Sequence, residues 1–487
     1  MDGVVEATCH DGCKGKKSQF LQHTYDFATI VRSGEEEIQI CSSKKNHMIL
    51  SLFYHRGFMK ERIRSKDIFE ASCAIIPGGV NSPTRAFPGL AMTPIIAQSG
   101  QGAMVCDADG NSYIDYCGSW GALILGHSHP AIVEAAVEQV RLGASFGMAT
   151  PYELDLAAKI QKHLPSLEKM RFVSSGTEAT MSAIRVARGY SGKDKIVKFM
   201  GNYHGHCDAL LVHSGSAAFQ INPEASSKGV PSDFVKHTFC LPFNDLVFCR
   251  DFLRSRDDIG CVIIEPIAGN MGLVPADRDF LYMLREETAK KGIVLIFDEV
   301  ITGFRVGLKG AQGYYGITPD LTALGKVVGG GFPTAAFGGR AEIMDHLTPL
   351  GGVYQAGTLS GHPVAMRAGL AAITELEKPG VYEKLEAMTL SLVEPLRKMM
   401  HDHDIAGCIN QIGSMFTPYF GPTEVRTKVA LDLNLYRQIF TGLFEKGIYI
   451  APAPYEANFI STAHTQQHID ATLEAFEASF KNSFVAV

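Results

Sequence analysis

The feature that most constrains the fold is a series of four short, largely apolar runs in the middle of the chain, separated by longer segments. The runs cover residues 170–173, 196–199, 261–264 and 293–297. A strand that is apolar along its whole length is buried on both faces, which happens when helices cover both sides of a parallel sheet. The sequence therefore predicts an α/β fold around a mainly parallel sheet.

Local signals predict several elements around this sheet. Residues 150–164 begin with Thr150 as N-cap, Pro151 at the first helical position and Glu153 at the capping-box position, which predicts a helix. Residues 66–79 predict a short helix that ends at Pro77. Residues 102–116 predict a hairpin, because the turn residues at 109–111 separate two β-rich runs.

Composition excludes several classes of function. The 487 residues are 46% hydrophobic with a net charge of −6, which argues against a nucleic-acid binder that depends on a basic surface. No apolar run approaches membrane-spanning length. Eleven scattered cysteines, an odd number, favour a reducing compartment over a disulfide framework. We expect a cytoplasmic protein, or one of the plastid stroma if the source is a photosynthetic eukaryote, with no nucleic-acid or membrane partner.

The chain divides into four segments by its patterns. Residues 1–60 lack sustained periodicity and predict a poorly ordered extension. Residues 61–120 form an N-terminal segment, 121–380 the large domain, and 381–487 a smaller C-terminal α+β domain of amphipathic helices and short strands. A zinc site at Cys9, His10 and Cys13 is disfavoured, because no second pair of ligands follows at a suitable distance.

Two charged residues have apolar neighbours along the chain. Asp298 comes directly after the run 293–297, so it lies at the carboxyl end of a strand, where ligands bind in open parallel sheets. A structural ion pair or a helix cap would also explain a carboxylate there. Lys326 stands between apolar residues just before three glycines, and a lysine in such a desolvated position has a lowered pKa and can form Schiff bases. The more common meaning of an isolated lysine is a solvated surface charge.

Two loops supply further candidates. Ser175, Gly176 and Thr177 lie between a short strand and a helix, where free amides and hydroxyls can bind a phosphate, although a helix cap with no ligand is the commoner meaning. In the segment 201–208, Tyr203 could cover a flat aromatic ring. His204, His206 and Asp208 alternate in the same segment and leave a metal site as a less favoured alternative.

Together these candidates match one cofactor. Pyridoxal 5'-phosphate (PLP) needs an anion site for its phosphate, a lysine for its aldehyde and a carboxylate that keeps its ring nitrogen protonated. The group 175–177, Lys326 and Asp298 could supply these three functions. The sequence therefore predicts a PLP enzyme without a metal.

At this point the motifs resemble those of a known family. "FDEVITGFRVG" and "GKVVGGGFP" resemble the class III aminotransferases, PLP enzymes of fold type I. The resemblance covers about residues 61–487 and implies a seven-stranded, mainly parallel sheet covered by helices, with a smaller α+β domain built from N- and C-terminal segments. The motifs "GGVNSPTRAF" and "AGTLSGHP" are more specific, and resemble the family members that move an amino group within one molecule. An intermolecular ω-aminotransferase is the alternative.

The resemblance also implies roles for individual residues. Lys326 would form the Schiff base and carry protons, Asp298 would pair with the ring nitrogen, and Asn270 would bond near the ring hydroxyl. Ser175, Gly176 and Thr177 would hold the phosphate, and Tyr203 would cover the ring. Gly357 and Thr358 would reach the phosphate of a neighbouring subunit, which implies a homodimer with shared sites. The substrate-binding residues would be Ser82, Arg85, Trp120 and Glu456.

Three departures from the family pattern affect specificity rather than cofactor chemistry. Ser174 and His362 stand where the family has Asn. The stretch 211–234 follows the family's mobile loop only loosely. We expect the segment 206–233 to close over the site during turnover, although an ordinary surface loop has the same composition.

Overall fold

The structure is a computed structural model that describes residues 59–214 and 223–483. The described residues belong to one compact unit, Gly57–Val487. Nearly all of the expected extension 1–60, including the alternative zinc ligands Cys9 and Cys13, lies outside the described residues. The domain boundaries at 120 and 380 stay predictions.

A seven-stranded sheet forms the centre of the large domain, as predicted. Its strand order is β4-β14-β13-β12-β9-β5-β8. The strands are β4 (Lys169–Val173), β5 (Lys195–Phe199), β8 (Thr238–Leu241), β9 (Ile259–Ile264), β12 (Val294–Glu299), β13 (Leu321–Leu324) and β14 (Ala335–Gly339). The pairs from β8 to β13 are parallel, and β14 is antiparallel to both of its neighbours. The four apolar runs correspond to β4, β5, β9 and β12, so those four predictions are confirmed.

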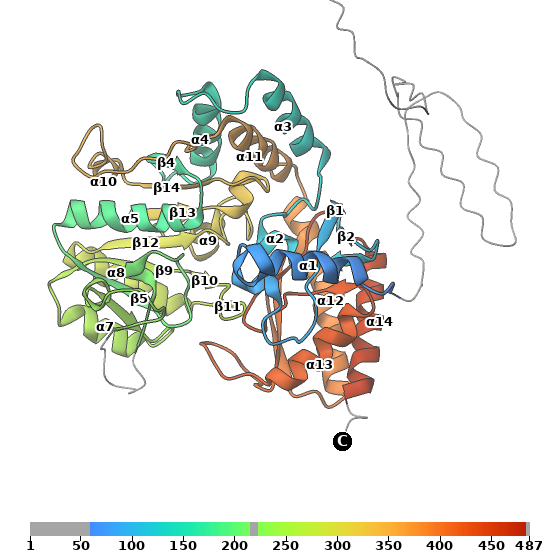
Figure 1. The fold of residues 1–487 in the computed structure, drawn as a ribbon. Helices are drawn as coiled ribbons and strands as arrows, with labels where there is room; N and C mark the ends of the chain where they lie inside the picture. The colour runs from blue at the N-terminus through green and yellow to red at the C-terminus, as the bar shows by residue number, and fades with distance from the viewer. Residues whose placement is uncertain (1–58, 215–222, 484–487) are drawn as a thin grey trace, which may run out of the picture. The chain divides into compact units, whose positions relative to one another are not determined.

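Helices cover both faces of this sheet (Figure 1). Helix α5 (Gly176–Ser191) lies on one face, and α7 (Leu246–Arg254) and α8 (Arg278–Lys291) lie on the other. Side chains alternate along β12 between the two faces: Val294 and Ile296 pack in the core beneath α5, whereas Leu295 and Phe297 pack in the core beneath α8. The strand is buried on both faces, which explains its continuous apolar sequence.

The predicted local elements are also present. Helix α1 (Ile63–Ile75) ends just before Pro77, and β2 (Met104–Asp107) pairs with β3 (Ser112–Asp115) as an antiparallel hairpin. Helix α4 (Pro151–His163) has the full capping box between Thr150 and Glu153.

A smaller sheet joins the beginning and the end of the described chain. Its order is β1-β2-β3-β17, with β1 (Ala97–Gln101) from the N-terminal segment and β17 (Ile448–Tyr449) from the C-terminal segment. Strand β17 pairs in parallel with β3. The smaller α+β domain therefore includes both ends, as the family resemblance implies.

The C-terminal helices pack beside this small sheet. Helices α12 (Val381–Asp402) and α13 (Leu433–Phe444) both pack against α14 (Gln466–Ser483), and the three are coloured orange to red in Figure 1. They pack with a three-stranded sheet of β15 (Gly407–Ile412), β16 (Met415–Phe420) and β18 (Asn458–Phe459).

The remaining elements are short or lie around the large domain. Helix α11 (Pro363–Leu376) packs against α3 (Pro130–Leu142) and α4. No helix within the described ranges is long and apolar enough to cross a membrane. The other elements are η1 (Pro77–Gly79), η2 (Pro83–Ala86), α2 (Gly118–Gly121), η3 (Asp208–Leu210), β6 (Val212–Ser214), β7 (Pro223–Ala225), α6 (Ser232–Val235), β10 (Ile267–Ala268), β11 (Val274–Pro275), α9 (Gly310–Tyr315), η4 (Lys326–Gly329) and α10 (Ala341–Met344).

Candidate active site

Asp298 lies at the carboxyl end of β12 and is only 5% exposed. Strand alternation places it on the α5 side of the sheet, the side of Val294 and Ile296. One carboxylate oxygen lies 2.8 Å from Nδ1 of His204, and the other accepts the amide of Val300 at 3.0 Å. His204 is buried, and burial lowers its pKa, so the neutral ring donates from Nδ1 to the carboxylate. No basic residue forms an ion pair with Asp298 among the residues described, apart from this histidine.

Lys326 lies just beyond the carboxyl end of the neighbouring strand β13. Asp298 is paired with Ala323 in the register of β12 and β13, so the two charged residues are at the ends of adjacent strands. Burial lowers the pKa of the Lys326 amine, and the charges of Asp298, Glu265 and Glu456 oppose that change. The backbone of Lys326 has a φ of 49°, a left-handed conformation that is uncommon for a residue other than glycine. Such conformations occur more often at functional sites than elsewhere.

Glu265 is a site residue that sequence reasoning missed. It follows β9, the strand next to β12, and is 3% exposed. Its carboxylate accepts the amide of Tyr203 at 2.7 Å, the amide of Gly269 at 3.0 Å and Nδ2 of Asn270 at 3.0 Å. Burial, followed by the charge of Asp298, raises the pKa of Glu265 to about 7. The signal was the same as for Asp298, an acid directly after a buried apolar run.

The start of α5 has the features of an anion site. Ser175 is the N-cap, and its Oγ accepts the amide of Glu178 at 3.2 Å. The Glu178 carboxylate instead accepts the amide of Ser174, so the capping-box spacing is realised only in part. Among the described residues, no acceptor bonds the amides of Ser175, Gly176 and Thr177. These free amides and the positive end of a 16-residue helix favour an anion.

The loop with Tyr203 lies against this helix start. A Cβ added to Gly205, which has a φ of +86°, would come within 2.8 Å of the side chain and backbone of Thr177. The loop can therefore approach the helix only with glycine at this position. Tyr203 is 49% exposed, and its pKa is raised by burial and by the charges of Glu456 and Asp298.

The structure brings together some of the proposed substrate residues. Glu456 is close enough to Lys326 for their charges to interact, and burial raises the pKa of Glu456 to about 7. The amide of Arg85 bonds the carbonyl of Ser82 at 3.1 Å in the turn η2. Arg85 is exposed, and none of its described neighbours forms a hydrogen bond or an ion pair with its guanidinium. Trp120 is half-buried.

Gly357 and Thr358 do not join this group of residues. Both are exposed, in a turn where the amide of Ser360 bonds the carbonyl of Gly357 at 3.2 Å. Their expected role at a neighbouring subunit stays a prediction. His362, one of the family departures, is the half-buried N-cap of α11.

The alternative metal site is not formed. Nδ1 of His204 faces Asp298, whereas Nδ1 of His206 lies 3.2 Å from Oγ1 of Thr177. Within the described ranges, no group of three His, Cys, Asp or Glu residues could hold a metal ion. Residues 215–222 of the expected closing segment lie outside the described residues, so its closure stays a prediction.

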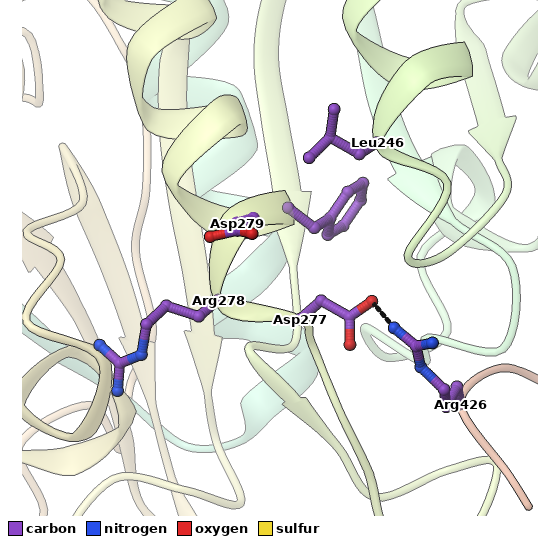
Figure 2. Close-up of a pocket in the computed structure, with 6 residues that line it drawn as sticks. Leu246, Asp277, Arg278, Asp279 and Arg426 are labelled. Atoms are coloured by element: carbon purple, nitrogen blue, oxygen red, sulfur yellow. Dashed lines mark hydrogen bonds and ion pairs between the residues drawn. The ribbon is translucent and has the colours of Figure 1, made fainter.

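A surface pocket of about 370 Å³ lies elsewhere, beside the start of α8. Figure 2 shows the side chains of Asp277 and Arg426 joined at this pocket, with Oδ2 and Nη2 2.5 Å apart. It is lined by Leu246, Asp277, Arg278, Asp279, Phe280 and Arg426. None of the candidate site residues lines it, so this pocket does not belong to the site.

The residues at the ends of β12 and β13 fit PLP. A buried amine with a lowered pKa suits an aldehyde, and no residue in the described part of the chain hydrogen-bonds that amine. A carboxylate fixed by His204 suits a protonated ring nitrogen. The free amides at 175–177 suit a phosphate. The arrangement defines a PLP-dependent enzyme of the transferase fold.

Comparison with known proteins agrees with this class. A family model for class-III aminotransferases matches residues 88–480, so the chain belongs to the class-III aminotransferase family. A curated relative, the glutamate-1-semialdehyde 2,1-aminomutase of Protochlamydia amoebophila, is 50% identical over 432 residues, which is 88% of this chain and 100% of the relative.

Two solved structures share the fold. An ω-transaminase from Sphaerobacter thermophilus matches with a TM-score of 0.81 and 34% identity, over 86% of this chain and 98% of that one. A transaminase with PLP bound matches with a TM-score of 0.79 and 32% identity, over 87% of this chain and 98% of that one. The PLP-dependent fold predicted from the sequence is therefore confirmed.

Proposed function

We propose that this protein is a glutamate-1-semialdehyde 2,1-aminomutase, which moves an amino group within one molecule to give 5-aminolevulinate for porphyrin (tetrapyrrole) biosynthesis. The observation that carries the proposal is the 50% identity over the full length of a curated enzyme with this activity. We place the reaction in the cytoplasm, or in the plastid stroma of a photosynthetic eukaryote. Cys73, Cys106 and Cys117 form no disulfide bond, which supports a reducing compartment.

The cofactor would be PLP and its pyridoxamine form, which when bound supplies an electron sink for carbon acids next to nitrogen. The amides and hydroxyls of Ser175, Gly176 and Thr177 would hold its phosphate, and Asp298 would pair with its ring nitrogen. Tyr203 would cover the ring. Asn270 would bond near the ring hydroxyl, and the hydrogen bond that its Nδ2 donates to the Glu265 carboxylate would fix its orientation.

Lys326 would bind the aldehyde and move protons at the substrate carbon. Because burial lowers its pKa, the amine gives up its proton more readily than an exposed lysine, which suits it to accept and return a proton. His204 would keep the carboxylate of Asp298 oriented towards the ring, since its neutral Nδ1–H donates to that carboxylate. Glu265 and Glu456, with pKa values of about 7, would set the charge around Lys326 near neutral pH.

Ser82, Arg85, Trp120 and Glu456 would receive the substrate. Arginine suits its carboxylate because the planar guanidinium forms two parallel hydrogen bonds with that group. Arg85 is exposed and its guanidinium has no partner among the described residues, so the guanidinium donors are available.

The active form would be a homodimer with shared sites. Thr358 is exposed beside Leu359, which is 52% exposed, and Leu350 and Tyr354 in the same segment are 72% and 70% exposed. Large apolar side chains in such a stretch are typical of an interface between subunits. Covering this stretch with a second copy would bring Gly357 and Thr358 to the neighbouring phosphate.

The decisive experiment supplies glutamate 1-semialdehyde with no amino donor or acceptor. We expect 5-aminolevulinate to form in many turnovers per subunit, because the amino group stays within one molecule. The Lys326→Ala variant is the control and should lose at least about 100-fold in rate, since it removes the proton-transfer group. Turnover only after an amino donor and a keto acid are added would reject the aminomutase and favour the ω-aminotransferase, the activity named for one structural neighbour.

A further inference from the structure

Arg305 is a buried cation for which the functions above provide no role. It is 1% exposed and is among the largest fully buried side chains of the described residues. No carboxylate forms an ion pair with it among the described residues. Burial lowers the pKa of its guanidinium to about 9. A buried charge without a counter-ion destabilises the folded protein, and an apolar side chain of similar volume often gives higher stability.

The guanidinium connects three segments that are far apart in the sequence. Nη2 donates to the carbonyl of Gly121 at 2.5 Å. Nη1 donates to Oγ of Ser414 and to the carbonyl of Ile460, both at 3.2 Å. The guanidinium carbon lies 5.1 Å from the centre of the Phe459 ring. Arg305 therefore joins the loop after β12, which follows Asp298, to the turn at 121 and to the C-terminal domain.

The segment held by Nη2 is strained. Gly118, Ser119, Trp120 and Gly121 all have positive φ values, of 51°, 52°, 59° and 89°. For Ser119 and Trp120 this conformation costs free energy and persists only where the surroundings enforce it. A Cβ at Gly121 would lie 2.8 Å from the Phe459 ring, so the turn fits tightly against that ring. The bond from Arg305 ends on this turn, one residue after Trp120.

We propose that Arg305 is a positioning residue: it fixes the left-handed turn 118–121 and so holds Trp120 in the substrate pocket. The placing of Trp120 in that pocket rests on the proposed function. The fork of the guanidinium suits this task, because it bonds the turn and the C-terminal domain at the same time from fixed directions. Binding of the substrate, rather than the chemical step, should depend on it.

Trp120 is the only tryptophan of the sequence, so its fluorescence reports on this turn directly. In the full-length, cofactor-loaded protein, Arg305→Met should increase the quenching of Trp120 emission by acrylamide. We expect KM for glutamate 1-semialdehyde to rise roughly tenfold or more, with kcat changed less than about threefold, as for a lost hydrogen bond from a charged group. Arg305→Lys keeps the charge without the fork and should show the same direction of change.

Ser414→Ala is the matched control, because it removes one acceptor of Nη1 and leaves the bond to Gly121. It should keep native quenching and native KM. A folded Arg305→Met protein with both values unchanged would overturn the proposal, and so would a Ser414→Ala protein with the same defects. If Arg305→Met does not fold, the same comparison with Arg305→Lys decides. Should the unmodified protein lack aminomutase turnover, the proposed function fails, while the quenching comparison still tests Arg305.

Discussion

At the scale of single residues, Asp298 and Glu299 show how one position along a strand changes the role of a carboxylate. Asp298 faces the side of α5 and His204, where the candidate site lies. Glu299 is fully buried and accepts hydrogen bonds from the amides of Ala311 and Gln312. Because side chains alternate across a strand, neighbouring acids reach opposite faces. Glu299 therefore organises the following loop, and only Asp298 is available to a ligand.

The buried carboxyl groups predict how stability depends on pH. The folded-state pKa of Glu456, about 7, lies above the ordinary value of 4.5. Its contribution to the stability of the cofactor-free protein is therefore present below about pH 4.5 and is lost as the pH rises through 7. One pKa unit corresponds to about 1.4 kcal/mol, so the loss is on the order of a few kcal/mol.

Glu456→Gln should remove this dependence. Urea unfolding of the cofactor-free protein between pH 5 and 8 should show a flatter free energy of unfolding for the variant than for the unmodified protein. Glu383→Gln, at an exposed position of α12, should follow the unmodified protein. Parallel curves for Glu456→Gln and the unmodified protein would contradict the assignment of a raised pKa.

At the scale of elements, β14 shows where sequence patterns are weak. Its sequence is AAFGG, and alanine and glycine both have low strand propensity. No local pattern therefore predicted this strand. A Cβ at Gly338 or Gly339 would lie 2.4 Å or closer to the backbone oxygen of a neighbouring strand or loop. The strand exists because its neighbours β4 and β13 leave a narrow space between them, which only the folded sheet defines.

The start of α5 is a helix cap and the phosphate site that we propose, and the two functions can be separated. Ser175→Ala should lower the free energy of unfolding of the cofactor-free protein by about 1 kcal/mol through loss of the cap. It should also weaken PLP binding roughly tenfold, since the variant lacks the hydroxyl that we propose to bond the phosphate. Thermal unfolding and equilibrium dialysis with PLP measure the two effects.

Asp245→Ala is the matched control for this prediction. Asp245 caps α7, where its Oδ1 accepts the amide of Phe248 at 3.0 Å. The variant should lose a similar free energy of unfolding and keep native PLP affinity. Equal losses of affinity in the two variants would mean that Ser175 acts on the cofactor only through general stability.

At the scale of the whole molecule, the proposed dimer links assembly to the site. Leu359→Asp places a charge in the stretch that we assign to the subunit interface, and burying an unpaired charge is costly. We expect the dimer to weaken at least about 100-fold and cofactor content to fall, because Thr358 would lose the neighbouring phosphate. Size-exclusion chromatography with light scattering and cofactor absorbance measure these effects.

An exposed apolar residue of α7, outside the stretch 350–359, provides the control. Val247 on α7 is 57% exposed, so Val247→Asp should leave assembly and cofactor content unchanged. A Leu359→Asp protein that remains dimeric with full cofactor would remove this stretch from the interface.

By itself, the sequence determined the class of fold and the main cofactor-binding candidates. Apolar strands and capped helices follow from local periodicity. Asp298 and the start of α5 follow predicted strands directly, so their places at the sheet edge could be predicted. Lys326 was a candidate because of its apolar neighbours and the glycines after it, and the strand before it, β13, was not predicted. The chemical type of each side chain and its position along the chain indicated the same kind of site. The relation of these residues to PLP also followed from chemical type alone.

Only the tertiary structure decided which distant residues complete the site. The pairing of His204 with Asp298, the bond of Glu265 with the Tyr203 amide and the bonds of Arg305 to Gly121, Ser414 and Ile460 join residues separated by 62 to 184 positions. No local pattern encodes such contacts, since they depend on how strands and domains pack. The pKa values of Glu265 and Glu456 arise from burial, which likewise exists only after the chain has folded.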